Sequence, residues 1–459
     1  MTSAASIAAA VRAGRTSAVA VLEQHLARIA DENPRLLALT VVFAERARAE
    51  AHRVDAVVAR GEDPGALAGV PFSVKENIDL TWSATTHGWR GLAGAAPERD
   101  AAIVRRMRAA GGVPIGRGNM PDFGMRWDTD NELFGRTRNP FAPDRSAGGS
   151  SGGDAVAVAT GMAAIGLGND FGGSVRIPAA ATGVFGLRPS LGRVPRAAVR
   201  GVPVAMTLQQ FSVNGPLARS IGDLELALDV LAGPDADDPM SLDLPTEPRE
   251  SAPRRVAVVR DPLGWGVDAR VAASVDAAAA RLAAAGWTVE HVEPPMLEEA
   301  AVLWRRLACT DMLLTLDPAV LPEPLGASAT RFLRDSTAAA RPYETAAEYA
   351  SAWARRAPIA AEWRRFQREY PIVLGPVQST GTPPVDFDLG GPDAATAAWR
   401  ALALTVTVNF LGLPAVAVPG GVDGGGVPIG VQVIAPMHAD RLALAAGRDA
   451  AAEVPAPPR

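Results

Sequence analysis

Apolar residues recur at helical spacing in the first sixty residues, and the pattern then changes. The segments "AVAVLEQHLARIA" (residues 18–30) and "VVFAERARAEAHRVDAVVA" (residues 41–59) repeat apolar positions every three or four residues, which predicts two amphipathic helices. From Leu67 onward, short runs rich in Val, Ile and Gly ("GVPFSV", "GVPIGRG", "AAIGLG", "GVFGL") alternate with helix-like segments such as "DAAIVRRMRAAG". Strands that alternate with helices indicate an α/β fold.

The second half of the chain begins with an acidic, proline-rich stretch at residues 233–250, which predicts a surface connection. A strand–helix–strand pattern follows it, and residues 296–368 predict mostly helices. A proline- and glycine-rich loop at residues 375–393 precedes a final helix–strand–strand–helix stretch, and the ending "EVPAPPR" predicts a disordered tail. These patterns divide a single domain into a helical lead-in (1–66), a core (67–232), a variable and mostly helical region (233–395), a C-terminal part of the core sheet (396–451) and a tail (452–459).

The most membrane-like segment is "ALALTVTVNFLGLPAVAVPG", residues 401–420, which is nearly long enough to span a bilayer. Thr405, Thr407 and Asn409 stand in its first half and two prolines in its second. These residues favour a buried helix that runs into a buried strand, so we expect no membrane partner.

Composition and charge narrow the function classes. The chain has 459 residues, of which 48% are hydrophobic and 21% charged, as in a globular protein with a large core. Its net charge of −5 gives no basic footprint, which argues against a nucleic-acid partner. A single cysteine, Cys309, forms no internal disulfide and suggests no metal cluster. We expect a cytoplasmic protein without metal or cofactor, and the sequence leaves a homodimer open.

One lysine stands in a chain whose other basic residues are all arginines. Lys and Arg total 45, and Lys75 is the only lysine. Burial can lower the pKa of a lysine until it loses its proton, whereas the guanidinium of arginine stays protonated. Lys75 ends the apolar run "VPFSVK", which predicts a buried strand, where a lysine is rare unless paired or functional. Lys75 is therefore a candidate general base, with chance survival of one lysine codon as the alternative.

Two glycine- and serine-rich clusters, "SAGGSSGGDAVAVATG" (residues 146–161) and "GLGNDFGGSVRIPA" (residues 166–179), permit four interpretations. Tight turns without chemistry are the simplest, because glycine suits a backbone that turns sharply or approaches another group closely. A dinucleotide fingerprint is the second, since the later cluster contains G-x-G-x-x-x-G. Pro178 argues against it, because it stands where the following helix should run, and no acidic residue lies near the expected ribose position.

A nucleophile elbow and a serine–lysine relay are the other two interpretations. Ser150 and Ser151 both satisfy G-x-S-x-G, and His438 is available for a triad. The preceding "RTRNPFAPDRSA", however, contains two prolines and does not fit the buried strand that an elbow requires. The relay joins both clusters to Lys75, because a serine becomes a nucleophile when a base such as a neutral lysine removes its proton.

The segments "GVPFSVKENIDL", "GGSSGGDAVAVATG" and "GLGNDFGGSVRIPA" together resemble the amidase signature family of Ser-Ser-Lys hydrolases. The intervals agree, since 75 residues separate Lys75 from Ser150 and 24 separate Ser150 from Ser174. The likeness is continuous over about residues 67–231, whereas residues 235–395 match only loosely. It implies an α/β fold with one large mixed β-sheet covered by helices on both faces.

The resemblance also implies the roles of individual residues. Ser174 would be the nucleophile, Lys75 the base and Ser150 the proton shuttle between them, with a cis peptide bond before Ser150. Asp170 and Arg176 would support the nucleophile loop without taking part in the chemistry.

Substrate binding, by the same resemblance, falls on backbone groups. The N–H groups of Phe171, Gly172, Gly173 and Ser174 would form the oxyanion hole, where a glycine leaves room for the carbonyl oxygen. The backbone carbonyl of Gly124 would hold the substrate amide.

The acyl pocket is expected to draw on residues 120–135, on the helical middle region and on the loop at 375–393. Trp127, Trp304 and Met312 suggest an apolar or aromatic acyl group, although a place in the protein core is the simpler interpretation of all three.

These observations predict an amidase that hydrolyses a small-molecule carboxylic amide through an acyl-enzyme on Ser174. An amide-forming acyltransferase or an amidotransferase A subunit would use the same three residues, and both stay open as alternatives. Ile177 argues against the amidotransferase, because the resemblance places a glutamine there in that group. A nucleotide-binding oxidoreductase is the remote alternative.

Overall fold

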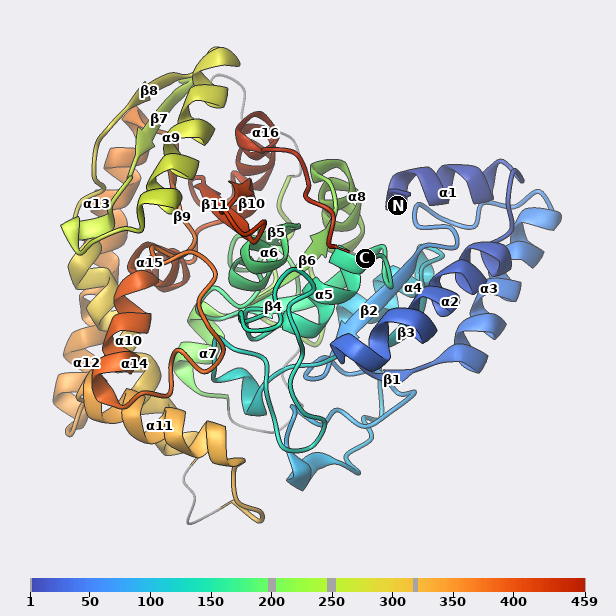
Figure 1. Ribbon diagram of the computed structural model, residues 1–459, viewed down its shortest axis with the longest axis horizontal. Coiled ribbons are helices and arrows are strands. Elements are labelled where there is room, and N and C mark those ends of the chain that lie inside the picture. Colours follow the sequence, from blue (N-terminus) through green and yellow to red (C-terminus); the bar gives the residue numbers. More distant parts are fainter. Residues whose placement is uncertain (1, 197–203, 246–252, 317–320, 459) are drawn as a thin grey trace.

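The computed structural model describes residues 2–196, 204–245, 253–316 and 321–458 and is built around one 11-stranded sheet (Figure 1). The strand order is β1-β3-β2-β4-β6-β5-β10-β11-β9-β7-β8. The strands are β1 (Leu39–Val42), β2 (Pro71–Lys75), β3 (Val113–Gly118), β4 (Ile165–Asp170), β5 (Phe185–Arg188), β6 (Val213–Ala218), β7 (Arg255–Val258), β8 (Thr288–Glu290), β9 (Ile372–Pro376), β10 (Ala415–Val422) and β11 (Pro428–Ile434).

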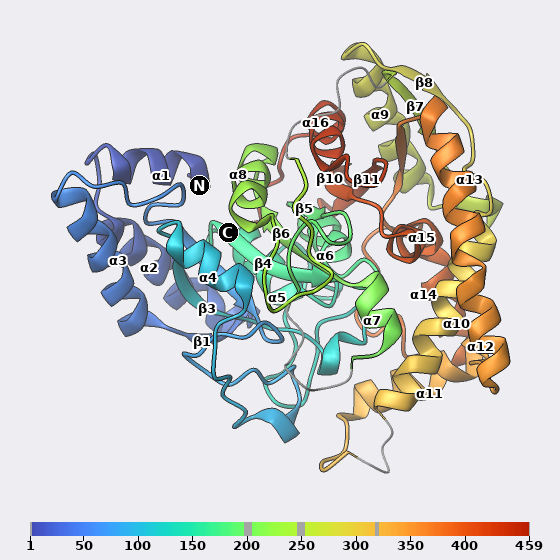
Figure 2. The same ribbon diagram turned by 180° about the vertical axis from the view of Figure 1, so that it is seen from behind.

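Helices surround this sheet. They are α1 (Ala4–Arg12), α2 (Ala18–Leu36), α3 (Ala44–Ala59), α4 (Ala102–Ala109), α5 (Gly152–Thr160), α6 (Arg176–Thr182), α7 (Met206–Phe211), α8 (Ile221–Leu231), α9 (Ala269–Ala284), α10 (Leu297–Thr315), α11 (Ala327–Ala340), α12 (Ala346–Ala354), α13 (Arg356–Glu369), α14 (Pro392–Ala401), α15 (Ala403–Leu411) and α16 (Asp440–Ala450). Helices α1–α3 lie at one end of the molecule and α10–α13 at the other, as both views show (Figures 1 and 2).

Helices cover both faces of the sheet, as the atoms closest to two glycines show. A Cβ at Gly186 in β5 would lie 2.8 Å from Ala179 of α6, and one at Gly447 in α16 would lie 2.6 Å from Val416 in β10. Gly186 pairs with Ala417, the neighbour of Val416, and adjacent strand residues point to opposite faces. Helices α6 and α16 therefore lie on opposite faces. The predicted mixed sheet with helices on both faces is confirmed.

The sheet is mixed because its parts come from separate stretches of chain. Strand β2 pairs in parallel with β3 and β4, whereas β10 pairs antiparallel with β5 and β11. The last strands of the chain, β10 and β11, lie in the middle of the sheet, and β11 carries β9 with β7 and β8 beyond it. The region 233–395 thus adds three strands to the same sheet, and the division into subregions remains a prediction.

Three local predictions were wrong. Residues 41 and 42 belong to strand β1 and not to a helix, because β1 pairs antiparallel with β3. Pro178 does not prevent a helix, since it stands in the first turn of α6, where a missing N–H costs little. The tail is packed in part, because Val454 contacts the core and a Cβ at Gly183 would lie 2.4 Å from Pro455.

Residues 401–420 form a buried helix and a buried strand, as predicted. Helix α15 is entirely buried, and it leads through residues 412–414 into β10. Among the described residues, no single helix is long and apolar enough to cross a membrane, while α14 and α15 reach that length and hydropathy only as a pair bent by 70°.

Candidate active site

Strand β2 places Lys75 in the interior of the protein. The apolar residues before it form a strand between β3 and β4, and Lys75 is the last residue of that strand and is wholly buried. Its Nζ donates to Ser150 Oγ at 2.8 Å and to Asn169 Oδ1 at 2.8 Å. Burial lowers the pKa of Lys75, and the carboxylates of Asp154 and Asp170 oppose that effect only in part.

Ser150 lies in a tight loop that precedes α5. The peptide bond from Gly149 to Ser150 is cis, as the resemblance implied. A Cβ at Gly149 would lie 2.7 Å from the backbone carbonyl oxygen of Arg126, so no side chain fits there. The next residue, Ser151, donates its backbone N–H to the carbonyl of Ser174 at 3.1 Å. This bond ties the loop of Ser150 to the loop of Ser174.

The loop of Ser174 is held by Asp170, which ends strand β4. The Asp170 carboxylate accepts hydrogen bonds from the backbone N–H of Gly173 at 2.9 Å and from the guanidinium of Arg176 at 3.0 Å. Arg176 is itself wholly buried and donates to Asn409 Oδ1 at 2.6 Å. Burial alone would raise the pKa of Asp170, but Arg176, together with Arg188 and Asn409, more than offsets it and holds that pKa below its usual range. Asp170 and Arg176 therefore brace the loop, as predicted.

The expected oxyanion donors are not all directed to one point. Phe171, Gly172 and Ser174 line the same cavity as Ser150. The N–H of Gly173 is instead donated to Asp170, which takes it out of the predicted set. The role of Gly173 lies in its backbone, with φ of +98° and a Cβ position 2.6 Å from Ile177 and Thr405 side-chain atoms.

Two tryptophans hold the carbonyl groups of this loop. Trp304 Nε1 donates to the carbonyl of Phe171 at 3.1 Å, and Trp127 Nε1 donates to the carbonyl of Gly172 at 3.0 Å. In a trans peptide the C=O and N–H groups point in opposite directions, so each bond also fixes the direction of the next N–H group. Sequence reasoning did not find this role, because the loop and Trp304 are 133 residues apart.

A cavity of about 420 Å³ opens onto Ser150 and Ser174. Trp127, Trp304 and Met312 all line it, and the two tryptophans also belong to the core cluster. Gly124 lines it too, and a Cβ there would lie 3.0 Å from Ser150 Oγ.

The loop at 375–393 does not reach this cavity, which corrects the expected lining. Its place is taken by Ala395 and Trp399 of α14. The loop instead contacts residues 120–135 through Arg126. There the buried Arg126 donates to Asp388 at 2.7 Å and to Asp386 at 2.9 Å.

The hydrogen-bonding roles of Asn169 and Asn77, and the place of His87 in the cavity, were not predicted from the sequence. Asn169 Oδ1 accepts from Lys75, and Asn169 Nδ2 donates to Asn77 Oδ1 at 2.7 Å. Asn77 stands two residues after Lys75, so its position in "VKEN" was an available signal. His87 also lines the cavity, and burial lowers its pKa to about 4, so its imidazole is neutral near pH 7.

The elbow interpretation finds no support in the arrangement. No described strand ends directly before Ser150 or Ser151, since the preceding residues 139–149 are loop with isolated bridges at Arg145 and Ser146 only. His438 lines a separate cavity and not the one at Ser174. Among the described residues, no group of three His, Cys, Asp or Glu side chains is arranged to hold a metal ion.

Comparison with known proteins decides the family. The family model described as Amidase matches residues 20–444. The chain belongs to the amidase family. An indoleacetamide hydrolase of Bradyrhizobium diazoefficiens is 36% identical over 457 residues, which cover 98% of this chain and 86% of that protein.

Other amidase relatives differ in what they are named for. The A subunit of the glutamyl-tRNA(Gln) amidotransferase of Deinococcus radiodurans is 37% identical over 487 residues, covering 98% of this chain and 97% of that protein. A solved bacterial aryl acylamidase of the amidase signature family matches with a TM-score of 0.86 at 27% identity, covering 98% of this chain and 95% of the other. The chain is thus an amidase signature enzyme that acts on carbon–nitrogen amide bonds.

Proposed function

We propose that this enzyme hydrolyses a small-molecule carboxylic amide through an acyl-enzyme on Ser174, with Ser150 and Lys75 as the proton relay. The hydrogen bond of 2.8 Å between the buried Lys75 Nζ and Ser150 Oγ carries the proposal. Ser150 and Ser174 line one cavity, so a substrate carbonyl can meet both hydroxyl groups. The lowered pKa of Lys75 supports a neutral amine near pH 7.

Acylation begins with proton transfer. Neutral Lys75 takes the hydroxyl proton of Ser150, which takes that of Ser174 as Ser174 Oγ bonds to the carbonyl carbon. The carbonyl π electrons move onto oxygen, and the N–H groups of Phe171, Gly172 and Ser174 stabilise that oxyanion.

The amide then breaks as the relay runs in the other direction. The Lys75 ammonium returns its proton through Ser150 to the departing nitrogen, the C–N bond breaks, and an ester remains on Ser174. Water repeats the sequence: it loses a proton to Ser150, adds to the ester carbon and releases the acid from Ser174.

An apolar or aromatic acyl group suits the cavity. The rings of Trp127 and Trp304 stack with centroids 6.4 Å apart, and Phe332 meets the Trp127 ring edge-on at 6.0 Å. Phe171 lies 5.5 Å from the Trp304 ring. Such surfaces favour flat apolar groups. The similarity to an indoleacetamide hydrolase points in the same direction.

An amidotransferase A subunit is the second candidate, because relatives with that name have similar identity. Ile177 weighs against it, because the family resemblance places a glutamine at this position in that group. An amide-forming acyltransferase would use the same relay in the opposite direction.

A substrate panel separates the candidates. Ammonia release is measured with indoleacetamide, benzamide, hexanamide and glutamine, and the two aryl amides are expected to give the highest kcat/KM. Glutamine as the best substrate would favour the amidotransferase, and no release from any amide would count against hydrolysis.

The relay is tested by substitution and labelling. Lys75→Arg is expected to keep the far-UV circular dichroism of the wild type and to lose nearly all turnover, because a guanidinium does not deprotonate. A fluorophosphonate is expected to label Ser174, as read by peptide mass spectrometry. Full turnover by Lys75→Arg, or labelling at Ser151, would overturn the assignment.

A further inference from the structure

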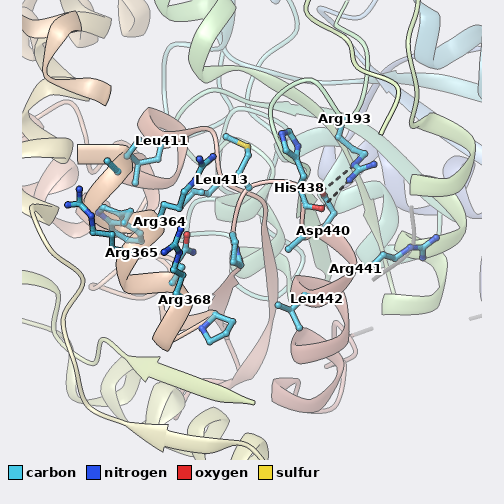
Figure 3. A pocket seen from close by; sticks show the side chains of 18 of the residues that line it. Arg193, Arg364, Arg365, Arg368, Leu411, Leu413, His438, Asp440, Arg441 and Leu442 are labelled. Carbon is cyan, nitrogen blue, oxygen red and sulfur yellow. Dashed lines mark hydrogen bonds and ion pairs between the residues drawn. The ribbon is translucent and has the colours of Figure 1, made fainter. Parts of the chain in front are cut away.

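A second and larger cavity, of about 870 Å³, opens between α13 and the segment that leads into α16 (Figure 3). None of its lining residues also lines the cavity at Ser174. In the close view, Arg364, Arg365 and Arg368 lie on one side of it, and Arg193, His438 and Asp440 on the other. Amide hydrolysis at Ser174 uses no residue of this second cavity.

The walls of this cavity combine an apolar surface with positive charge. Its apolar residues come from α8, α13, the end of α15 with the residues after it, and the segment before and within α16; they include Leu228, Trp363, Leu411, Leu413, Met437 and Leu442. Five arginines also line it: Arg193, Arg364, Arg365, Arg368 and Arg441. Asp440 is the one acidic residue among the described lining residues.

Three of these arginines already have a carboxylate partner. Arg193 Nε donates to Asp440 Oδ2 at 3.3 Å. Arg365 is paired with Glu362, and Arg441 with Asp229. These pairs leave no net positive charge at their own positions.

Arg364 and Arg368 differ from the other three. Within the described part of the chain, neither side chain has an ion pair or hydrogen bond. They are four residues apart on α13, so both lie on one face of that helix. Two uncompensated guanidinium groups therefore stand beside an apolar cavity, on a chain whose net charge is −5.

We propose that this cavity binds a small organic anion, with its apolar body against the leucines and Met437 and its acidic group at Arg364 and Arg368. The volume lies within the range of about 300–1,000 Å³ that is usual for small-molecule sites, which are mostly apolar with a few charged groups. Guanidinium groups match the geometry of carboxylate, sulfonate and phosphate oxygens.

The experiment uses the full chain and 8-anilinonaphthalene-1-sulfonate, an aromatic anion whose fluorescence rises in apolar sites. Kd is measured for wild type and for Arg364→Glu/Arg368→Glu, which is expected to bind at least about tenfold more weakly, because both charge-assisted hydrogen bonds to the sulfonate are lost and two carboxylates repel it. Uncharged N-phenyl-1-naphthylamine, which lacks the sulfonate, is expected to bind the two proteins equally.

A matched control makes the same charge change elsewhere. Arg12 and Arg28 are exposed on α1 and α2, at the far end of the molecule from α13 (Figures 1 and 2). Arg12→Glu/Arg28→Glu is expected to change Kd less than about twofold, because charges so distant are screened by salt. An equal loss in both double variants would mean that net charge alone governs binding, and would overturn the proposal.

A second variant tests the cavity without removing its charge. Ala361→Trp, at an exposed position of α13 that lines the cavity, is expected to occupy part of it and to weaken binding of both the sulfonate and the uncharged dye. Unchanged affinity in both Ala361→Trp and Arg364→Glu/Arg368→Glu would place the dye at the Ser174 cavity and refute the site. Binding of a hexaglutamate peptide with higher affinity than the dye would refute a small-molecule occupant.

Discussion

At the residue scale, the proposed chemistry depends on Lys75, a lysine that the fold buries away from water. Lys75 shares its buried position with the carboxyl group of Asp154, which accepts from Ser73 Oγ at 2.6 Å. Burial favours the neutral form of each group, so it lowers the pKa of Lys75 and raises that of Asp154. The remaining charge on Asp154 works against a neutral lysine.

Asp154→Asn is therefore expected to move the acid limb of the kcat/KM profile to lower pH. The carboxylate raises the pKa of Lys75, so its removal lets Lys75 deprotonate at lower pH. Initial rates across a pH series measure the limb. Ser73→Ala removes the hydrogen bond and keeps the carboxyl group, so its limb is expected to stay nearer the wild type. A limb that moves to higher pH in Asp154→Asn would contradict the assignment of Lys75.

Trp304→Phe is expected to lower kcat about three- to tenfold with little change in KM. It keeps an aromatic ring and removes the hydrogen bond that orients the Phe171 carbonyl, and one such bond is worth about 0.5–1.5 kcal/mol. Trp399→Phe is the control, since Trp399 lines the same cavity but donates to Ala301 in α10. Steady-state kinetics that show a rise in KM alone would assign Trp304 to substrate contact only.

Sequence reasoning named the three residues of the proposed relay but not the residues that hold them in place. Lys75, Ser150 and Ser174 stand in short motifs at fixed intervals, which one chain displays directly. Asn169 stands in one of these motifs and Trp304 in none, yet neither hydrogen bond is visible in the sequence, because bonds across 94 and 133 residues exist only after the strands have paired. The same limit explains why Gly173 was expected among the oxyanion donors: only the folded loop directs its N–H to Asp170.

At the element scale, a buried charge cluster joins the loop at 375–393 to residues 120–135. Arg126 is wholly buried and donates to Asp386 and to the equally buried Asp388. The next residue, Trp127, holds the carbonyl of Gly172. The loop thus supports the active site from behind, although it does not line the cavity.

Arg126→Met is expected to lower the free energy of unfolding by about 3–5 kcal/mol, because it leaves Asp388 charged, buried and unpaired. Arg145→Met serves as the control. Arg145 is partly exposed, and its carboxylate partner Asp144 lies no closer than 4.0 Å, so the ion pair is weak and a loss below about 1 kcal/mol is expected. Urea denaturation measures both. Equal losses would show that the cluster adds no special stability.

Elements of the core were predicted well because their signals are local. Valine, isoleucine and glycine runs mark β2, β3, β4 and β5 in the sequence itself. Strand β1 was missed because "TVV" precedes a strong helical pattern, and only its pairing with β3 makes it a strand. At residues 41 and 42 the pairing with β3 therefore outweighs the local preference for a helix.

At the scale of the whole molecule, the order of strands was beyond prediction from one sequence. The hairpin of β10 and β11 is formed by the last part of the chain and yet lies between β5 and β9. Periodicity identifies strands but does not say which strands pair over long separations. This placement makes the C-terminal hairpin the link between the catalytic half of the sheet and β9, β7 and β8.

Gly430 in β11 tests that link. A Cβ there would lie 2.3 Å from Ala180 Cβ and 2.6 Å from its Cα, so Gly430→Val forces α6 away from the sheet. Helix α6 begins with Arg176, which braces the loop of Ser174. We expect a loss of about 3 kcal/mol in the free energy of unfolding and a fall in kcat, because the same displacement reaches both the hairpin and the nucleophile loop.

The matched control is Gly424→Val at the tip of the same hairpin, where an added Cβ meets no atom within 4 Å. It is expected to change stability by less than about 1 kcal/mol. Circular dichroism and tryptophan fluorescence follow unfolding in each variant. Because β11 joins both halves of one continuous sheet, the two probes are expected to give one shared midpoint even in Gly430→Val. Separate midpoints would mean that β7, β8 and β9 unfold independently of strands β1 to β6. The hairpin would then not join the two parts of the sheet into one cooperative unit.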